Sequence, residues 1–203
     1  MRHTFSFTRH MRRPAQGFTI VELLVVIVVL GVLASITIVA YNGVSARADD
    51  TKMKASMNQL EKAMQQFYAD TGKVPLGGYE SNGVLANGEC PTATRINGGW
   101  IGKGMYLCST EDVLTAQNYI PSKFVESLPS NNLYRPSDSA LLKSRRSVMV
   151  YRCGTTEKLA VMWQLKMPTT ADIQSIDSTL AQCGLGSSYK TSYGMRAGRI
   201  VSF

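Results

Sequence analysis

Residues 17–34 read GFTIVELLVVIVVLGVLA, an apolar segment with a single acidic residue, Glu22, near its beginning. From Leu23 to Ala34 every residue is apolar or glycine. A carboxylate near the centre of a bilayer costs roughly 2.5 to 3.5 kcal/mol, so an acidic residue in a membrane-length segment indicates a specific partner. The segment therefore predicts a membrane helix in which Glu22 takes part in a charge interaction.

A cleavage between Gly17 and Phe18 provides that partner. It frees an α-amino group at Phe18, one helical turn before Glu22. At about 4 Å and an effective dielectric constant near 20, the attraction between two such charges is on the order of 4 kcal/mol before desolvation, which is enough to matter between neighbouring subunits. The alternative is that Glu22 only complements the positive end of the helix dipole, an effect of a few tenths to about 1 kcal/mol.

Two stretches of the sequence resemble the type IV pilins and the related type II secretion pseudopilins. One is residues 17–24 with the apolar run that follows, and the other is YADTGKVP, residues 68–75. The resemblance covers about residues 9–75. It implies a long N-terminal helix packed on a small antiparallel sheet.

The resemblance also implies how the N-terminus is processed and used. A membrane prepilin peptidase is expected to cut after Gly17 and to methylate the new amine of Phe18. Glu22 is then expected to guide docking onto the Phe18 amine of a subunit already in the growing filament. Many members of the family have a proline where this chain has Val39, so a kink or melted segment of the helix at this position stays an open question.

The sequence predicts four parts. They are a cleaved basic leader (1–17), a transmembrane and filament-core helix (18–41), an amphipathic helix that continues into the head (42–72), and a globular head (73–203). The second part has 24 residues, which form a helix of about 36 Å. That length is enough to cross a hydrocarbon core of about 30 Å.

Positive charge in the leader predicts the orientation of the chain in the membrane. Four arginines precede the apolar segment, and basic residues in that position stay on the cytoplasmic side. Everything after about Tyr41 is therefore expected outside the cytoplasm. The alternative is an ordinary secretory signal that is cleaved at Val-Ser-Ala, residues 44–46.

The four cysteines lie in the part expected to be exported. Cys90, Cys108, Cys153 and Cys183 match no CxxC metal spacing, and an oxidising compartment favours disulfides. Four cysteines allow three pairings. We favour Cys90 with Cys108 and Cys153 with Cys183, because each closes a loop of moderate length and stabilises the fold by about 2 to 4 kcal/mol. Free structural thiols are the alternative.

The helix is expected to continue beyond the membrane. An apolar stripe with helical spacing predicts one buried face, and its residues are Met53, Met57, Leu60, Met64 and Phe67. Gly72 supplies a C-terminal cap and Pro75 prevents continuation, so the helix is predicted to end at about Thr71.

The rest of the head has weaker signals. Residues 76–104 are rich in Gly, Asn and Ser and predict a surface loop with few elements. A short helix over 111–118 is predicted, with Ser109 or Thr110 as its cap.

Regular structure is predicted again towards the C-terminus. Residues 147–152 and 158–165 predict an antiparallel hairpin, and residues 198–203 predict a final strand. Thr170 is expected to cap a helix that runs to about Gln182. The fold class is therefore α+β, with a small antiparallel sheet packed on the long helix.

Catalytic chemistry is not expected. The only histidines, His3 and His10, lie in the leader, so the exported part lacks the commonest general base and imidazole zinc ligands. The glycine-rich phosphate-binding motifs and the EF-hand pattern are missing too. We therefore predict a protein that is not an enzyme, with no cofactor and no metal site, although calcium held by scattered loop oxygens stays open.

Two pairs of adjacent acidic residues, Asp49-Asp50 and Glu111-Asp112, are interpreted as structural. Consecutive residues on a helix do not face one another. We therefore expect these carboxylates to lie on solvated helix surface or to complement a first turn.

A basic patch formed by Lys143, Arg145 and Arg146 has aromatic neighbours, including Tyr151. Such a patch is able to bind a DNA backbone in an uptake filament. The alternative is an ordinary solvated loop. The net charge of +8 for the whole chain falls to about +4 without the leader, which is a weak signal for polyanion binding.

These features predict a structural subunit of a type IV pilus-like filament, processed by prepilin peptidase and polymerised through its N-terminal helix. Type II secretion pseudopilins and DNA-uptake pilins are alternatives in the same class, and a monomeric membrane-anchored extracytoplasmic binding module is the alternative of a different class. The expected partners are other pilins, the peptidase, a platform protein, an assembly ATPase, the membrane and DNA. The expected location is the cytoplasmic (inner) membrane for the single-pass precursor and the cell surface for the filament.

Overall fold

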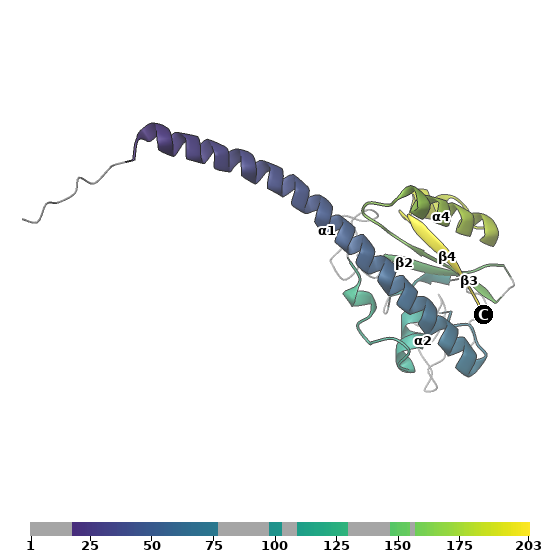
Figure 1. The fold of residues 1–203 in the computed structure, drawn as a ribbon. Coiled ribbons are helices and arrows are strands. Elements are labelled where there is room, and N and C mark those ends of the chain that lie inside the picture. Colours follow the sequence, from purple (N-terminus) through teal and green to yellow (C-terminus); the bar gives the residue numbers. More distant parts are fainter. Residues whose placement is uncertain (1–17, 77–97, 103–108, 130–146, 155–156) are drawn as a thin grey trace, which may run out of the picture. The chain divides into compact units, whose positions relative to one another are not determined.

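The computed structural model describes residues 18–76, 98–102, 109–129, 147–154 and 157–203 (Figure 1). The chain divides into two compact units, Met1–Gly43 and Val44–Phe203. Helix α1, Ile20–Thr71, has residues in both units and ends where the sequence predicts. It is helical at residue 39 and on either side of it, so the absence of proline there coincides with unbroken helical hydrogen bonding.

The part of α1 in the first unit is apolar and uncovered by its own chain. The large hydrophobic side chains described between Phe18 and Tyr41 are all exposed. This stretch is long and apolar enough to cross a membrane. Two of its hydroxyl groups are satisfied within the helix, because Ser35 Oγ donates to the carbonyl oxygen of Val32 at 2.7 Å and Thr37 Oγ1 to that of Leu33 at 2.5 Å.

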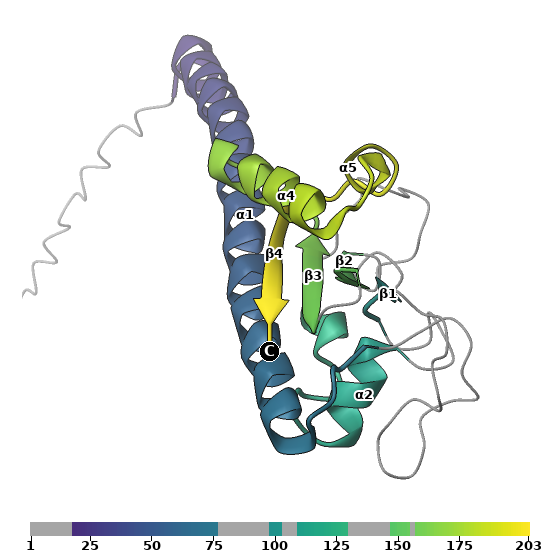
Figure 2. The same cartoon turned by 90° about the vertical axis from the view of Figure 1, so that its right-hand side faces the viewer.

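The second unit is built on a four-stranded antiparallel sheet in the order β1-β2-β3-β4. Its strands are β1 (Gly98–Trp100), β2 (Val148–Arg152), β3 (Lys158–Trp163) and β4 (Ala197–Ser202). Val150 pairs with Val161, and Val161 pairs with Arg199. The predicted hairpin and final strand therefore lie side by side (Figure 2).

Strand β1 lies within residues 76–104, where the sequence predicts a surface loop with few elements; residues 77–97 and 103–104 are outside the described part of the chain. It pairs along β2 and places Gly98 opposite Tyr151. Gly98 has φ +124°, and a Cβ added there would lie 1.9 Å from the carbonyl oxygen of Val150. Only glycine fits this close approach. The pairing of β1 with β2 therefore requires the glycine at position 98.

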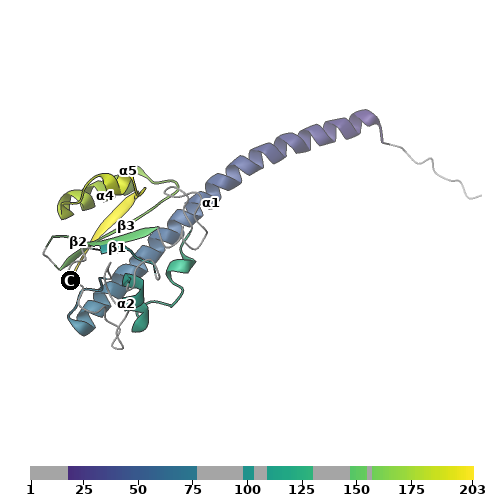
Figure 3. The ribbon, with the colours of Figure 1, turned by 180° about the vertical axis from the view of Figure 1, so that it is seen from behind.

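The sheet lies between two helical layers. On one face, the second half of α1 and helix α2 (Thr110–Ala116) enclose the larger core, and the predicted apolar stripe of α1 is buried in it. On the other face, helix α4 (Thr170–Cys183) packs on β3 and β4, with the short helix α5 (Ser188–Thr191) beyond it. Figure 3 shows α4 and α5 on the side of the sheet opposite α2. The predicted α+β class, with the sheet packed on the long helix, is confirmed.

Capping boxes begin helices α2 and α4. In α2 the cap is Ser109, whose Oγ accepts from the amide of Asp112 at 3.1 Å. In α4 the cap is Thr169, which corrects the predicted Thr170 by one residue. Thr169 Oγ1 accepts from the amide of Asp172 at 3.2 Å while Asp172 accepts from the Thr169 amide at 2.8 Å, and this reciprocal pair requires a spacing of three residues.

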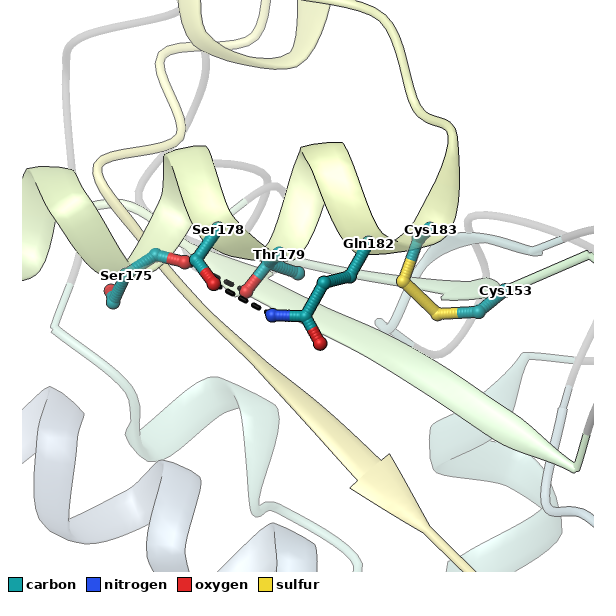
Figure 4. Close-up of a disulfide and its surroundings, with 6 residues drawn as sticks. All are labelled: Cys153, Ser175, Ser178, Thr179, Gln182 and Cys183. Carbon is teal, nitrogen blue, oxygen red and sulfur yellow. Dashed lines mark hydrogen bonds between the residues drawn. A yellow bond between two sulfur atoms is a disulfide. The ribbon is translucent and has the colours of Figure 1, made fainter.

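A disulfide joins the end of β2 to the end of α4. It links Cys153 to Cys183, the pair favoured from the sequence (Figure 4). Gly184 ends α4 with φ 63°, so the chain turns away directly after the bridge. Cys90 and Cys108 lie outside the described residues.

Replacing both Cys153 and Cys183 with serine is expected to lower the free energy of unfolding by about 3 kcal/mol, because the bridge closes a loop of about 30 residues. Urea denaturation of the purified protein in detergent, followed by circular dichroism, measures the change. Ser178→Ala is the control on the same helix, since Ser178 is exposed and bonds only Gln182 on α4 (Figure 4); it should shift stability by about 0.5 kcal/mol or less. Equal midpoints for the double variant and the unchanged protein would contradict a stabilising bridge.

Candidate functional site

The first turn of α1 holds Glu22 in a reciprocal cap with Thr19. Glu22 Oε2 accepts from the backbone N of Thr19 at 2.9 Å and from its Oγ1 at 2.7 Å, and the amide of Glu22 donates to Thr19 Oγ1 at 3.2 Å. This is a capping box, with threonine at the cap and glutamate three residues later. Sequence reasoning did not assign Thr19 this role, although the Thr-x-x-Glu spacing was the signal for it.

The cap leaves part of the carboxylate available. Both bonds from Thr19 end on Oε2 of Glu22, and Oε1 has no hydrogen-bond donor among the described residues. A carboxylate accepts several hydrogen bonds. Capping the helix and binding a cation are therefore compatible roles for Glu22, and the two readings of its charge do not exclude each other.

The surroundings of Glu22 are apolar. It is the only charged residue from Phe18 to Tyr41. Phe18, the residue predicted to become the new N-terminus, lies directly before the cap and is exposed. Gly17, the other residue of the predicted cleavage site, lies outside the described part of the chain. The first turn thus brings an accessible Phe18 and an oriented Glu22 to the same end of an apolar helix.

Three of the four carboxylates in the two acidic pairs are buried in the head, which corrects the expectation of solvated surface for Asp50, while Glu111 and Asp112 lie in the first turn of α2 as predicted. Asp50 is only 7% exposed, and its two oxygens accept from the amides of Lys166 and Met167 at 2.7 Å each. Glu111 and Asp112 are also buried: Asp112 closes the α2 cap, and Glu111 Oε1 accepts from the amide of Val125 at 3.2 Å. These carboxylates bond backbone donors of neighbouring segments, so their role is structural.

An ion pair connects α1 to the start of α4. Lys54 Nζ lies 2.8 Å from the carboxylate of Asp172, the residue that closes the α4 cap. Burial alone raises the pKa of Asp172, but the hydrogen bonds from Lys54 and Thr169 and the Lys54 charge outweigh it and lower the pKa overall.

The described residues contain no group of three or more His, Cys, Asp or Glu side chains placed to hold a metal ion.

The structure does not test the predicted polyanion contact. Lys143, Arg145 and Arg146 lie outside the described residues. Their neighbour Tyr151 belongs to β2 and packs against Tyr189, with ring centroids 5.0 Å apart.

Comparison with known proteins adds a family relationship to this geometry. The family described as the prokaryotic N-terminal methylation motif matches residues 12–38. The type II secretion system core protein G of Klebsiella michiganensis is 38% identical over 66 residues, which cover 32% of this chain and 46% of the relative. The fimbrial protein of Neisseria meningitidis serogroup B is 31% identical over 110 residues, which cover 53% and 57%. The type IV major pilin protein PilE1 of Neisseria gonorrhoeae is 33% identical over 65 residues, which cover 32% and 39%.

The family match is confined to the N-terminal region, residues 12–38. No solved structure matches the chain significantly, and the chain spans about half the length of the first two relatives, 46% and 57%. The predicted resemblance is confirmed: the chain carries the N-terminal methylation motif at residues 12–38 and is similar in sequence to a type IV major pilin protein and to a type II secretion system core protein.

Proposed function

We propose that this protein is a structural subunit of a type IV pilus-like filament, made as a single-pass membrane precursor and polymerised through its N-terminal helix. The observation that carries the proposal is Glu22, held in the first turn of a helix that is otherwise uncharged and exposed up to Tyr41. The names of its relatives, a secretion system core protein, a fimbrial protein and a major pilin, support the same class.

Charge and apolar surface together account for assembly. Removal of residues 1–17 frees the amine of Phe18, and Oε1 of Glu22 in a neighbouring subunit accepts from that amine. The apolar helices cover one another at the same time, so a subunit leaves the bilayer without exposing its apolar surface to water. In these dry surroundings the pair of charges is stronger than it is in water.

The proposal implies partners and locations. The subunit needs a prepilin peptidase, a platform protein, an assembly ATPase and other pilins, as a homo- or hetero-polymer. Residues 18–41 span the inner membrane in the precursor and form the filament core at the cell surface, while residues 42–72 and 73–203 form the head. The role is structural and not enzymatic.

Two kinds of alternative stand beside it. A type II secretion pseudopilin or a DNA-uptake pilin uses the same N-terminal region, and DNA contact at Lys143, Arg145 and Arg146 remains a prediction. A monomeric membrane-anchored binding module is the competing class. Its apolar helix is only a tether, and a tether has no use for an acidic residue at membrane depth.

Mass spectrometry of the mature protein is expected to find Phe18 at the N-terminus, carrying an N-methyl group. A Gly17→Ile variant is the matched control, because a bulky side chain next to the bond should keep the peptidase from accepting it, and this variant should retain the leader. An intact leader on the unsubstituted protein, or a start at Arg47 after signal-peptidase cleavage, would defeat the proposed processing.

A further inference from the structure

One hydrophobic side chain of the head is exposed in a way that its core does not explain. Among the described residues that follow α1, Met167 is the most exposed large hydrophobic side chain, at 44%. The other described methionines of the head are buried in its two cores. Met167 lies in the connection between β3 and α4.

The backbone around Met167 is firmly held. Its amide donates to Oδ2 of the buried Asp50 at 2.7 Å, and the preceding amide, of Lys166, donates to Oδ1 at the same distance. Pro168 follows and fixes its own φ, and Thr169 caps α4. Because the chain is restrained on both sides, the Met167 side chain is presented from a fixed position.

Charges next to Met167 are already paired within the head. Lys166 Nζ lies 2.6 Å from Asp49, Asp50 binds the two amides, and Lys54 binds Asp172 at 2.8 Å. An apolar partner that covers Met167 therefore leaves none of these ions without a counter-charge. The pairing also leaves none of them free to attract an anionic lipid headgroup, which favours a protein partner over a membrane surface.

We infer that Met167 packs against the apolar helix, residues 20–41, of a second copy of this chain, an inference that rests on the proposed filament. That helix is apolar on all sides and exposed, so the helices around it and the heads beside them must cover it. Methionine is unbranched and flexible, and it fits the irregular surface between helical side chains. Met167 is then a contact from head to helix that adds to the helix packing.

Two variants test this contact in cells that assemble the filament. Met167→Glu is expected to reduce the amount of filament about tenfold or more, because it places a charge against apolar side chains. Met167→Leu keeps the apolar surface and should assemble within about twofold of the unsubstituted chain. Both variants should show a urea midpoint close to that of the unsubstituted protein, since Met167 is exposed at the surface of the head and belongs to neither of its cores.

A photo-cross-linking amino acid at position 167 of the full chain identifies the occupant. The expected adduct joins position 167 to a peptide within residues 20–41 of another copy. An adduct to lipid, or to the head of another copy, overturns the inference, and so does assembly of Met167→Glu at the unsubstituted level. Absence of filaments from the unsubstituted chain overturns the proposed function instead, so the two failures are distinguishable.

Discussion

Replacing Glu22 with glutamine is expected to abolish filament assembly and to leave membrane insertion of the chain intact. Glutamine at this position still accepts the hydrogen bonds from Thr19, so the cap is kept and only the charge is lost. The attraction between Glu22 and a Phe18 amine is on the order of 4 kcal/mol before desolvation. If half of this attraction remains after desolvation, its loss weakens each contact between subunits by about thirtyfold. A polymer contains many such contacts, so the loss is repeated at every subunit.

Two companion variants separate the charge from the cap. Thr19→Val removes the hydroxyl but keeps the charge, so it costs about 1 kcal/mol of helix stability and reduces assembly far less than Glu22→Gln. Glu22→Leu removes both and should insert at least as well as the unsubstituted chain. Membrane fractionation measures insertion, and shearing followed by quantification measures filaments. Filaments from Glu22→Gln at the unsubstituted level would show that assembly does not depend on the charge of Glu22.

Replacing Asp50 with alanine is expected to lower the free energy of unfolding by about 3 kcal/mol. Asp50 is a buried carboxylate that bonds two amides at 2.7 Å. Hydrogen bonds to a charged group contribute about 1.5 to 3 kcal/mol, and their removal leaves the amides of Lys166 and Met167 without acceptors. A loss of this size shifts the melting temperature by roughly 6 to 12 °C for a chain of this length.

The neighbouring Asp49 is a matched control for that measurement. Its side chain is 33% exposed and forms a surface ion pair with Lys166. Asp49→Ala should therefore cost about 1 kcal/mol or less, and high salt should reduce the difference further. Thermal melting and urea unfolding of both variants in detergent provide the comparison. Equal losses for the two substitutions would show that the amide contacts of Asp50 add no stability of their own.

Hydrophobic periodicity in the sequence predicted the buried face of α1, the hairpin and the last strand. The stripe from Met53 to Phe67 repeats at helical spacing, so its burial followed from the sequence and is confirmed. The hairpin and the last strand were predicted to within one or two residues. Their β-branched and apolar residues form short runs, and glycine and charged residues mark the turns that bound these runs. In these elements, local pattern and tertiary structure agree.

Contacts between distant segments were not predictable. Asp49 and Asp50 are neighbours of identical type, and only Asp50 meets the amides of a connection 116 residues further on. Strand β1 carries two glycines and no alternation, and its position depends on pairing with β2. In the candidate site, Glu22 was predicted from its chemistry, whereas its use of Thr19 as a cap also depended on where α1 begins.

Strand β4 has a consequence for biogenesis. It comes last among the described strands, yet Val201 helps to enclose the stripe of α1, and Arg199 bonds Asn58 at 2.9 Å, 141 residues earlier. The face of α1, which is synthesised early, thus stays uncovered until residues 197–202 have been made. Such long-range closure is slow and leaves sticky surface bare in the meantime, so stalled or shortened chains should be prime targets for extracytoplasmic chaperones and quality-control proteases.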